Sequence, residues 1–525
     1  MTVVDRPRTL LGNARRWILL ACVFGHLSAL AREPDKFDVT PWRSDLENLE
    51  SALELRYPNL GWYASGEERD VDLVKSHQVA LGALDAARDE REAKRALVRF
   101  VQSFHDSHFQ WVPSTNERAA SAAQAASDVS TESPAPASVL PPVCEDLGVE
   151  APDRSAPSFP YASLPNLLRS ASEADVFPSA VVRIPGEGKA GLIRISSFTH
   201  LQYPALCERA VADLTAQGAS LSAKGVRDLM KDRWLSELAS TLARLKQEKA
   251  DVLIVDITHN FGGNDFGDWV VRMFTAAPVR SARLLLARGP GAAAYVDDQL
   301  RGLRRGLSLL PEGHAGLPAE FRESIGAFEL RRSRLANQRA CGSMSWVWRE
   351  HRRWTPGLCD GLVDMGYASG NFDYLPPVVP GLADIASYVY WPAVVDRYRG
   401  SWAGKVYLLT DAEVYSSAEM FAASMRDNGV ARIIGQRTGR AGCGNMSASS
   451  PIELPYSRLR FHIPDCVRLR ADGSNEIAGV APDIEFAVLP NERGSANAQR
   501  LLEVVRLDLQ AAPLAKSVRA WRDGR

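Results

Sequence analysis

The chain has 525 residues, of which 46% are hydrophobic and 24% charged, a composition typical of a globular protein with two or three hydrophobic cores. Its formal net charge is −1. A balance so close to zero excludes the strong positive field that attracts nucleic acids or anionic membranes, so we expect no nucleic-acid partner.

The first 31 residues read as a secretory signal. Arg15 and Arg16 precede the apolar run "WILLACVFGHLSALA", and Ala29 and Ala31 form an A-x-A cleavage site after Ala31. The run is short for a bilayer span, which makes an uncleaved anchor the weaker alternative, as is lipidation of Cys22. We therefore predict an exported protein, periplasmic or extracellular, without an integral membrane segment once residues 1–31 are removed.

Removal of that signal leaves an even number of cysteines: Cys144, Cys207, Cys341, Cys359, Cys443 and Cys466. In an exported chain this number predicts disulfides, with buried free thiols as the alternative. Sequence does not determine the connectivity, and nearest-neighbour pairs (Cys341 with Cys359, Cys443 with Cys466) are the simplest assumption. The cysteines show no CxxC spacing, so we expect no zinc site and no other metal or cofactor.

Residues 32–114 are predicted to form a helical N-terminal region. Apolar residues recur at three- and four-residue spacing in "RSDLENLESALELRY" and "EREAKRALVRFVQSF", and the pattern stops at Pro113 after "HDSHFQWVP". Residues 115–160 are rich in Ala, Ser and Pro and poor in large apolar side chains. Such a segment cannot bury enough surface to order itself, which predicts a flexible linker and a candidate processing site.

Three later stretches predict strands: "AGLIRISSF", "ADVLIVDIT" and "GKVYLLTD". Each precedes a helical pattern, which favours βα units, a largely parallel sheet and the α/β class. We divide the rest of the chain into a first part of an α/β core, a helical insertion, a second part of the core and a C-terminal helical tail: 161–284, 285–400, 401–490 and 491–525. The basic, Trp-containing insertion would be a solvated face, or would cap a cleft or mediate oligomers.

"EVYSSAEMFAASMRDNG" places two serines where the third predicted strand gives way to a helix. Ser416 precedes a helix that starts at about Ser417, where free backbone N–H groups and the helix dipole favour negative charge. A purely structural interpretation is that Ser416 is the N-cap of this helix. The second strand ends in the pair Gly262 and Gly263, and parallel strands of successive βα units end at one sheet edge, so this turn can face Ser416.

The blocks "LIVDITHNFGGN", "SSAEMFAASMRDNGVARIIGQRTG" and "NEIAGVAPDIEF" resemble, in order and character, the C-terminal processing peptidases, the S41 serine peptidases with a crotonase-like (ClpP-like) core. The resemblance implies that Ser416 is the nucleophile and that the N–H of Ser417, with Gly262 or Gly263, forms an oxyanion hole. In one branch of the family a Lys about 25 residues after the Ser is the base. That position is Ala441 here, and no Lys lies between Lys405 and Lys516.

The other branch, that of the tricorn core and the CPAF-type protease, uses a His in a D-x-H sequence and a Glu shortly before G-V-x-P-D. Asp106-Ser107-His108 and Glu476 match these motifs. The resemblance therefore implies that His108 is the general base and that Glu476 orients it, helped by Ser107. His105 and His259 are the rival bases.

The resulting hypothesis is an exported serine endopeptidase that hydrolyses peptide bonds of a polypeptide substrate through an acyl-enzyme. One alternative is an inactive S41-like binding or scaffold protein, which would have no chemical reason to keep all three groups. The other is a hydrolase of small esters or amides. No PDZ-like module is recognisable between Tyr161 and Ile184, which counts against selection of substrates by their C-terminal tail.

Overall fold

The structure is a computed structural model that divides into two compact units, Met1–Asp38 and Val39–Arg525; the fold below is that of the second. The described residues are 37–65, 71–113, 140–151, 163–170, 175–311, 317–337, 343–352, 361–379, 381–446, 451–489 and 493–511. The predicted signal and the pair Cys341 and Cys359 lie outside them. Within these ranges, no helix is both long and apolar enough to cross a membrane.

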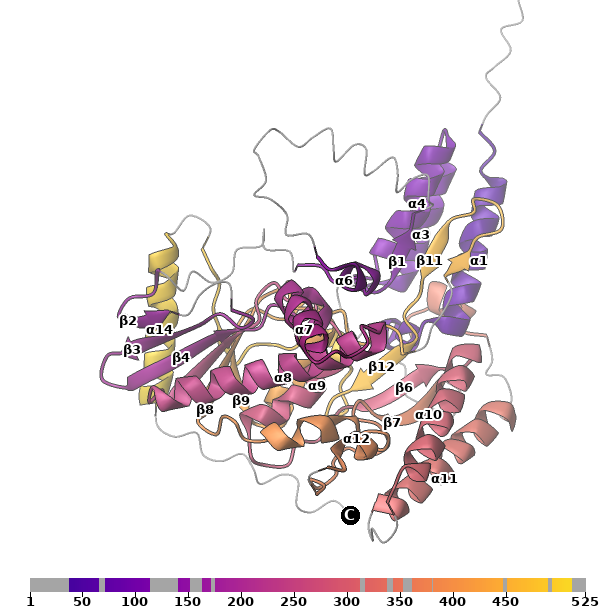
Figure 1. Cartoon of the computed structure of the whole chain (residues 1–525). Coiled ribbons are helices and arrows are strands. Elements are labelled where there is room, and N and C mark those ends of the chain that lie inside the picture. The colour runs from indigo at the N-terminus through magenta and orange to yellow at the C-terminus, as the bar shows by residue number, and fades with distance from the viewer. Residues whose placement is uncertain are drawn as a thin grey trace, which may run out of the picture. The chain divides into compact units, whose positions relative to one another are not determined.

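A seven-stranded sheet in the order β13-β9-β8-β5-β4-β3-β2 forms the centre (Figure 1). Its strands, in chain order, are β2 Leu167–Ser170, β3 Ser179–Ile184, β4 Gly188–Arg194, β5 Val252–Asp256, β8 Lys405–Thr410, β9 Ala431–Gly435 and β13 Ile484–Glu485. Pairing is parallel from β4 through β5, β8 and β9 to β13, and antiparallel among β2, β3 and β4. The three predicted strands and the α/β class are thus confirmed.

Alternate side chains of the central strands pack into two different hydrophobic cores, because successive residues of a strand point to opposite faces of the sheet. On β5, Leu253 and Val255 pack with helices α7 (Pro204–Ala216), α8 (Ala223–Gln247) and α13 (Ser417–Asp427). Val252 and Ile254 belong to the other core, which includes α14 (Gly494–Gln510). The predicted C-terminal helical tail is therefore, over its described part, a helix that covers one face of the sheet (Figure 1).

The segment predicted as a helical insertion contains strands as well as helices, which corrects its purely helical description. Helices α10 (Pro290–Ser308) and α11 (Leu317–Asn337) pack over β6 (Arg283–Ala287), β7 (Leu362–Tyr367) and β12 (Cys466–Leu469). These strands form an antiparallel sheet in the order β12-β6-β7. Short apolar runs do not distinguish strand from helix, and the pairing strand β12 comes from a distant part of the sequence. The shorter elements of this region are η4 Ser345–Trp348, α12 Ala383–Ala386 and η5 Trp391–Tyr398.

The N-terminal region is helical as predicted, but it ends in a strand. Its elements are α1 Thr40–Arg56, α2 Leu60–Ala64, α3 Leu73–Asp85, α4 Glu90–Gln102 and β1 Gln110–Val112. β1 pairs with β11 (Arg460–His462), and β11 also pairs with β10 (Ile452–Glu453). The segment just after His108 is therefore hydrogen-bonded to a strand from the C-terminal part of the chain. This pairing joins regions some 350 residues apart in sequence.

Part of the predicted linker is ordered. Residues 142–146 form the short helix α6 (Pro142–Asp146), and Cys144 is disulfide-bonded to Cys207 on α7. Crosslinking therefore fixes a segment whose composition alone would leave it disordered. The second disulfide joins Cys443 to Cys466 and confirms that predicted pair.

Candidate active site

Ser416 sits at a sharp turn between strand and helix. β8 ends at Thr410 and α13 begins at Ser417. The backbone of Ser416 has φ +55° and ψ −121°, a conformation that a residue with a side chain rarely adopts. Although Ser416 occupies the N-cap position, its side chain makes no capping hydrogen bond. The hydroxyl of Ser416 therefore does not cap the helix, which contradicts the purely structural interpretation of this residue.

The glycine turn after β5 lies directly against this serine. A Cβ on Gly262 would be 2.7 Å from Cβ of Ser416 and 2.9 Å from the nitrogen of Ser417, so glycine is needed for the approach. The N–H of Gly262 donates to Oδ1 of Asn260 at 2.8 Å. For the N–H of Gly263, the described residues provide no hydrogen-bond acceptor. Of the two predicted glycine donors, the geometry thus favours Gly263.

Ser417 connects the helix to the same turn through its side chain. Its hydroxyl donates to the carbonyl of Asn264 and accepts the N–H of Gly267 at 3.1 Å. Its own N–H begins α13 and so has no acceptor within the helix. Ser417 is 2% exposed, so its hydroxyl is structural while its N–H remains at the helix terminus.

The ring of His108 packs on the loop that follows β9. Its Nδ1 lies 3.1 Å from the carbonyl oxygen of Ala441. A carbonyl only accepts hydrogen bonds, so Nδ1 carries the hydrogen and Nε2 has the free lone pair that a general base needs. A Cβ on Gly444 would lie 2.9 Å from Nε2 and 2.7 Å from Cδ2, so glycine leaves room for the ring. Burial lowers the pKa of His108, with a smaller lowering by Arg468, while the bond to Ala441 raises it.

Asp106 fixes the turn that carries His108. Its Oδ1 accepts the backbone N–H of His108 at 3.0 Å, and its Oδ2 accepts the hydroxyl of Tyr57 at 2.8 Å. The same Oδ1 is 3.8 Å from the ring Nδ1 of His108. Burial raises the pKa of Asp106 to about 7. The Asp of the D-x-H motif is therefore a buried anchor of the histidine backbone.

Glu419 joins the nucleophile helix to the loop that holds the histidine. Its Oε1 accepts from the hydroxyl of Thr438 and the N–H of Arg440, both at 2.7 Å. Its Oε2 accepts from the N–H groups of Ala441 at 2.6 Å and Gly442 at 3.0 Å. Glu419 is fully buried on the first turn of α13. One carboxylate thus fixes the position of Ala441, whose carbonyl orients His108.

Glu476 does not contact His108 through its carboxylate, which is bound elsewhere. Arg468 donates to it from Nε at 2.8 Å and from Nη2 at 2.6 Å, and also donates from Nη2 to the carbonyl of Gly442 at 3.1 Å. Ser107 is exposed, and its carbonyl accepts from the side chain of Gln110. The structure therefore brings Glu476 to the histidine loop through Arg468, and not to the ring through Ser107.

The two rival histidines have other surroundings. The ring of His259 lies between carboxylates, with Nδ1 2.7 Å from Oδ2 of Asp411 and Nε2 3.5 Å from Oε2 of Glu413. His105 is exposed and lines a cavity. Neither has the carbonyl contact that sets the tautomer of His108.

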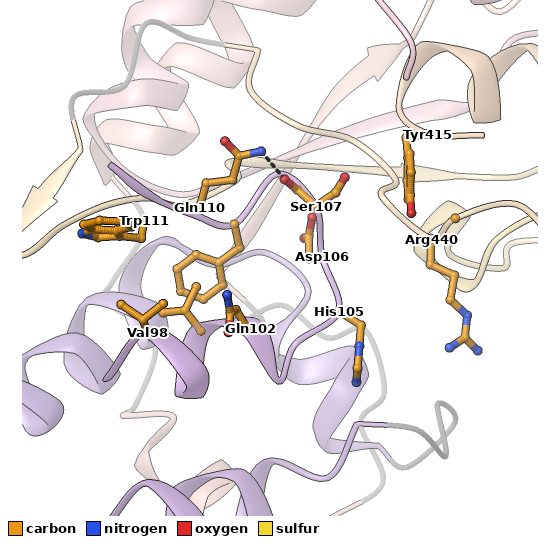
Figure 2. Close-up of a pocket in the computed structure, with 12 residues that line it drawn as sticks. Val98, Gln102, His105, Asp106, Ser107, Gln110, Trp111, Tyr415 and Arg440 are labelled. Atoms are coloured by element: carbon orange, nitrogen blue, oxygen red, sulfur yellow. Dashed lines mark hydrogen bonds between the residues drawn. The ribbon is translucent and has the colours of Figure 1, made fainter. Parts of the chain in front are cut away.

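A cavity of about 800 Å³ lies beside these groups (Figure 2). One side is formed by residues 98–111, including Ser107, which precedes His108; the other includes Tyr415, which precedes Ser416, and Arg440. The ring of Tyr415 stacks on the exposed ring of Phe261 at a centroid distance of 5.9 Å. The cavity is thus lined by sequence neighbours of the predicted nucleophile and base, while Ser416 and His108 themselves are not among its lining residues.

Comparison with known proteins shows similarity to a peptidase family over part of the chain. The sequence model of peptidase family S41 matches residues 367–486, which contain Ser416, Glu419 and Glu476. Over this segment the chain is similar to peptidase family S41. The solved structure of mature CPAF complexed with lactacystin shares the fold, with a TM-score of 0.53 and 15% identity over 90% of this chain and 98% of that chain. Mature CPAF gives a TM-score of 0.50 and 14% identity over 89% and 96%. No curated protein matches the sequence.

Some residues that support the candidate site were not identified from sequence. In the sequence, Glu419 was used only for its distance of three residues from Ser416. An acidic residue in the first turn of a helix is ordinarily explained by the helix dipole, so its sequence position suggests no further role. Arg468 belongs to none of the sequence motifs described above. Ala441 was noted only as the position where the other branch of the family has its Lys, and its carbonyl, which any residue would supply, makes the contact.

Proposed function

We propose that this protein is a serine endopeptidase of the S41 type that cleaves polypeptides through an acyl-enzyme on Ser416. The observation that carries the proposal is the conformation of Ser416, which is held at positive φ while its hydroxyl makes no capping bond. Strain of this kind costs on the order of 1–3 kcal/mol and persists where the surrounding structure imposes it, commonly at active sites. Burial of Gly262 against Ser416 imposes it here.

In the proposed acylation step, Nε2 of His108 takes the proton of the Ser416 hydroxyl as Oγ attacks the substrate carbonyl carbon. The resulting oxyanion accepts from the N–H groups of Ser417 and Gly263. When the C–N bond breaks, Nε2 returns the proton to the leaving amine. Water then repeats the sequence on the acyl-enzyme, releasing the second product and the free hydroxyl. The bond from Nδ1 of His108 to Ala441 keeps the required tautomer throughout.

The proposed role of Glu476 is indirect. Its ion pair with Arg468 is buried, with side chains 1% and 7% exposed, and Arg468 in turn holds the carbonyl of Gly442 next to Ala441. Loss of either partner would leave a buried charge unpaired. Glu476 thereby supports the loop on which the His108 ring lies.

Covalent labelling with a fluorophosphonate tests the proposal. Wild-type protein should label, Ser416→Ala should not label because it lacks the nucleophile, and His108→Ala should lower the rate by at least about 10³-fold because it lacks the base. Because the pKa of His108 lies below its usual 6.5, the base remains neutral in mildly acidic solution. The wild-type labelling rate should therefore rise to its half-maximum below pH 6.5 and be constant at neutral pH.

Lys405→Ala is the matched control, since Lys405 begins β8 at the end opposite Ser416. Hydrolysis of casein, compared with that of p-nitrophenyl acetate, then distinguishes a peptidase from an esterase. A folded wild-type protein that neither labels nor cleaves casein would contradict the proposal and favour a scaffold.

We further propose that the protein is exported. The predicted cleavage site after Ala31 and the two disulfides are the supporting observations. The mass of the mature protein, expressed with its own N-terminus in a bacterium and recovered outside the cytoplasm, should correspond to a chain that begins at Arg32. Recovery of only full-length chain in the cytoplasm would contradict export.

A further inference from the structure

The disulfide between Cys443 and Cys466 lies next to the loop that supports His108. Cys443 follows Ala441 and Gly442, whose N–H groups bind Glu419, and precedes Gly444, which faces the His108 ring. Its partner Cys466 begins β12. Both cysteines are buried, at 2% and 0% exposure. The bond therefore joins the support of the proposed base to a strand of the second sheet.

Hydrogen bonds around the disulfide also connect this loop to β12 and to the residue before it. The N–H of Asp465 donates to the carbonyl of Gly444 at 3.0 Å, and Oδ1 of Asp465 accepts the N–H of Met446 at 2.8 Å. Two residues past Cys466, Arg468 holds the carbonyl of Gly442. β12 itself is fixed, because Cys466 pairs with Leu286 of β6.

The first part of this loop is held by backbone hydrogen bonds, from the N–H of Thr438 to the carbonyl of Val480 at 3.2 Å and from the N–H of Gly439 to the carbonyl of Val414 at 2.8 Å. From Arg437 to Met446 it contains no helix or strand, and residues 447–450 lie outside the described ranges. The stretch from Ala441 to Gly444 is held by attachments that include Glu419, the disulfide, Asp465 and Arg468. The carbonyl of Ala441 and the space left by Gly444 both belong to this stretch, so the orientation of the ring depends on these attachments.

We propose that the Cys443–Cys466 disulfide is a positioning element of the active site that holds the Ala441 to Gly444 loop against His108 and so keeps the base aligned. The inference rests on the proposed function, in which His108 accepts the proton of Ser416. The chain offers a matched control, since the Cys144–Cys207 disulfide joins α6 to α7 and closes a longer segment, with a sequence separation of 63 against 23. In the chain-entropy view the control removes at least as much stability.

The test compares Cys443→Ala/Cys466→Ala with Cys144→Ala/Cys207→Ala, at a temperature where circular dichroism shows both to be folded. The readout is the fluorophosphonate labelling rate between pH 5 and 9. We expect the first variant to label at least about tenfold more slowly at neutral pH. Its labelling rate should also no longer rise with pH below 6.5, a rise that depends on His108 and that His108→Ala should remove as well. The control should keep that rise and stay within about threefold of wild type.

Equal rates and equal pH profiles in the two variants would overturn the inference. Failure of the wild type to label would contradict the proposed function instead, so the two failures are distinguishable. If the first variant does not fold, wild-type protein is titrated with dithiothreitol, which is oxidised as each disulfide gains two electrons and two protons to become two thiols. Mass spectrometry after alkylation identifies the reduced pair. A labelling rate that falls with reduction of Cys443–Cys466 supports the inference, and a rate that does not follow it overturns it.

Discussion

Ser416→Gly is expected to abolish covalent labelling and at the same time to make the protein more stable than Ser416→Ala. Both variants lack the nucleophilic oxygen, so both should lose activity by a factor on the order of 10⁶. They differ in the backbone. Alanine must keep φ +55° and ψ −121°, which glycine adopts without steric cost.

The expected difference in the free energy of unfolding is about 1–2 kcal/mol in favour of glycine, from strain of about 1–3 kcal/mol less the greater entropy of glycine in the unfolded chain. Urea denaturation of the two variants side by side measures it. A matched comparison is Ser424→Gly against Ser424→Ala, in the interior of α13, where glycine should be the less stable by roughly 0.5–1 kcal/mol. If glycine is also the less stable residue at 416, the strained conformation is not a property of the folded protein.

The second large effect concerns Glu419. Glu419→Ala removes the acceptor of three backbone N–H groups and one hydroxyl, all in the loop that carries Ala441. We expect a loss of about 3–5 kcal/mol in unfolding free energy, because buried donors left without acceptors each cost about 1–3 kcal/mol and some will find other partners. The labelling rate should fall at least about tenfold even where the protein is folded. Glu413→Gln, at an exposed carboxylate near Ser416, is the control and should change the unfolding free energy by less than about 0.5 kcal/mol.

Glu419 also gives a pH dependence of known sign. Burial raises its pKa from 4.5 to about 7, with a further contribution from the charge of Glu476. Between these two values the folded protein binds a proton that the unfolded chain does not, so the contribution to stability is complete below pH 4.5 and is lost as the pH rises through 7. Relative to Glu419→Gln, the wild type should therefore be more stable at pH 4.5 than at pH 8, by up to roughly 3 kcal/mol. A difference that is unchanged across this range would contradict the raised pKa.

The local elements of the catalytic core follow from the sequence. The apolar run 250–258 predicts a strand buried on both faces, and β5 is one. The helix that begins at Ser417 and ends at Asp427, two residues before Gly429 with its φ of +63°, is equally evident because its signals are local. The resemblance to the S41 peptidases is visible for the same reason, since it rests on short blocks around the strand ends.

Sequence by itself thus determined the α/β class and the position of Ser416 at the start of its helix, and it carried the resemblance to the S41 peptidases. The tertiary structure decided which groups support the active site. Glu476 binds Arg468 instead of the His108 ring, and a backbone carbonyl at Ala441 orients that ring. Side-chain partners separated by hundreds of residues depend on how strands from distant segments pair, as β1 does with β11 and β12 with β6, and backbone carbonyls are the same in every residue. No periodicity or motif can therefore reveal either contact before the chain is folded.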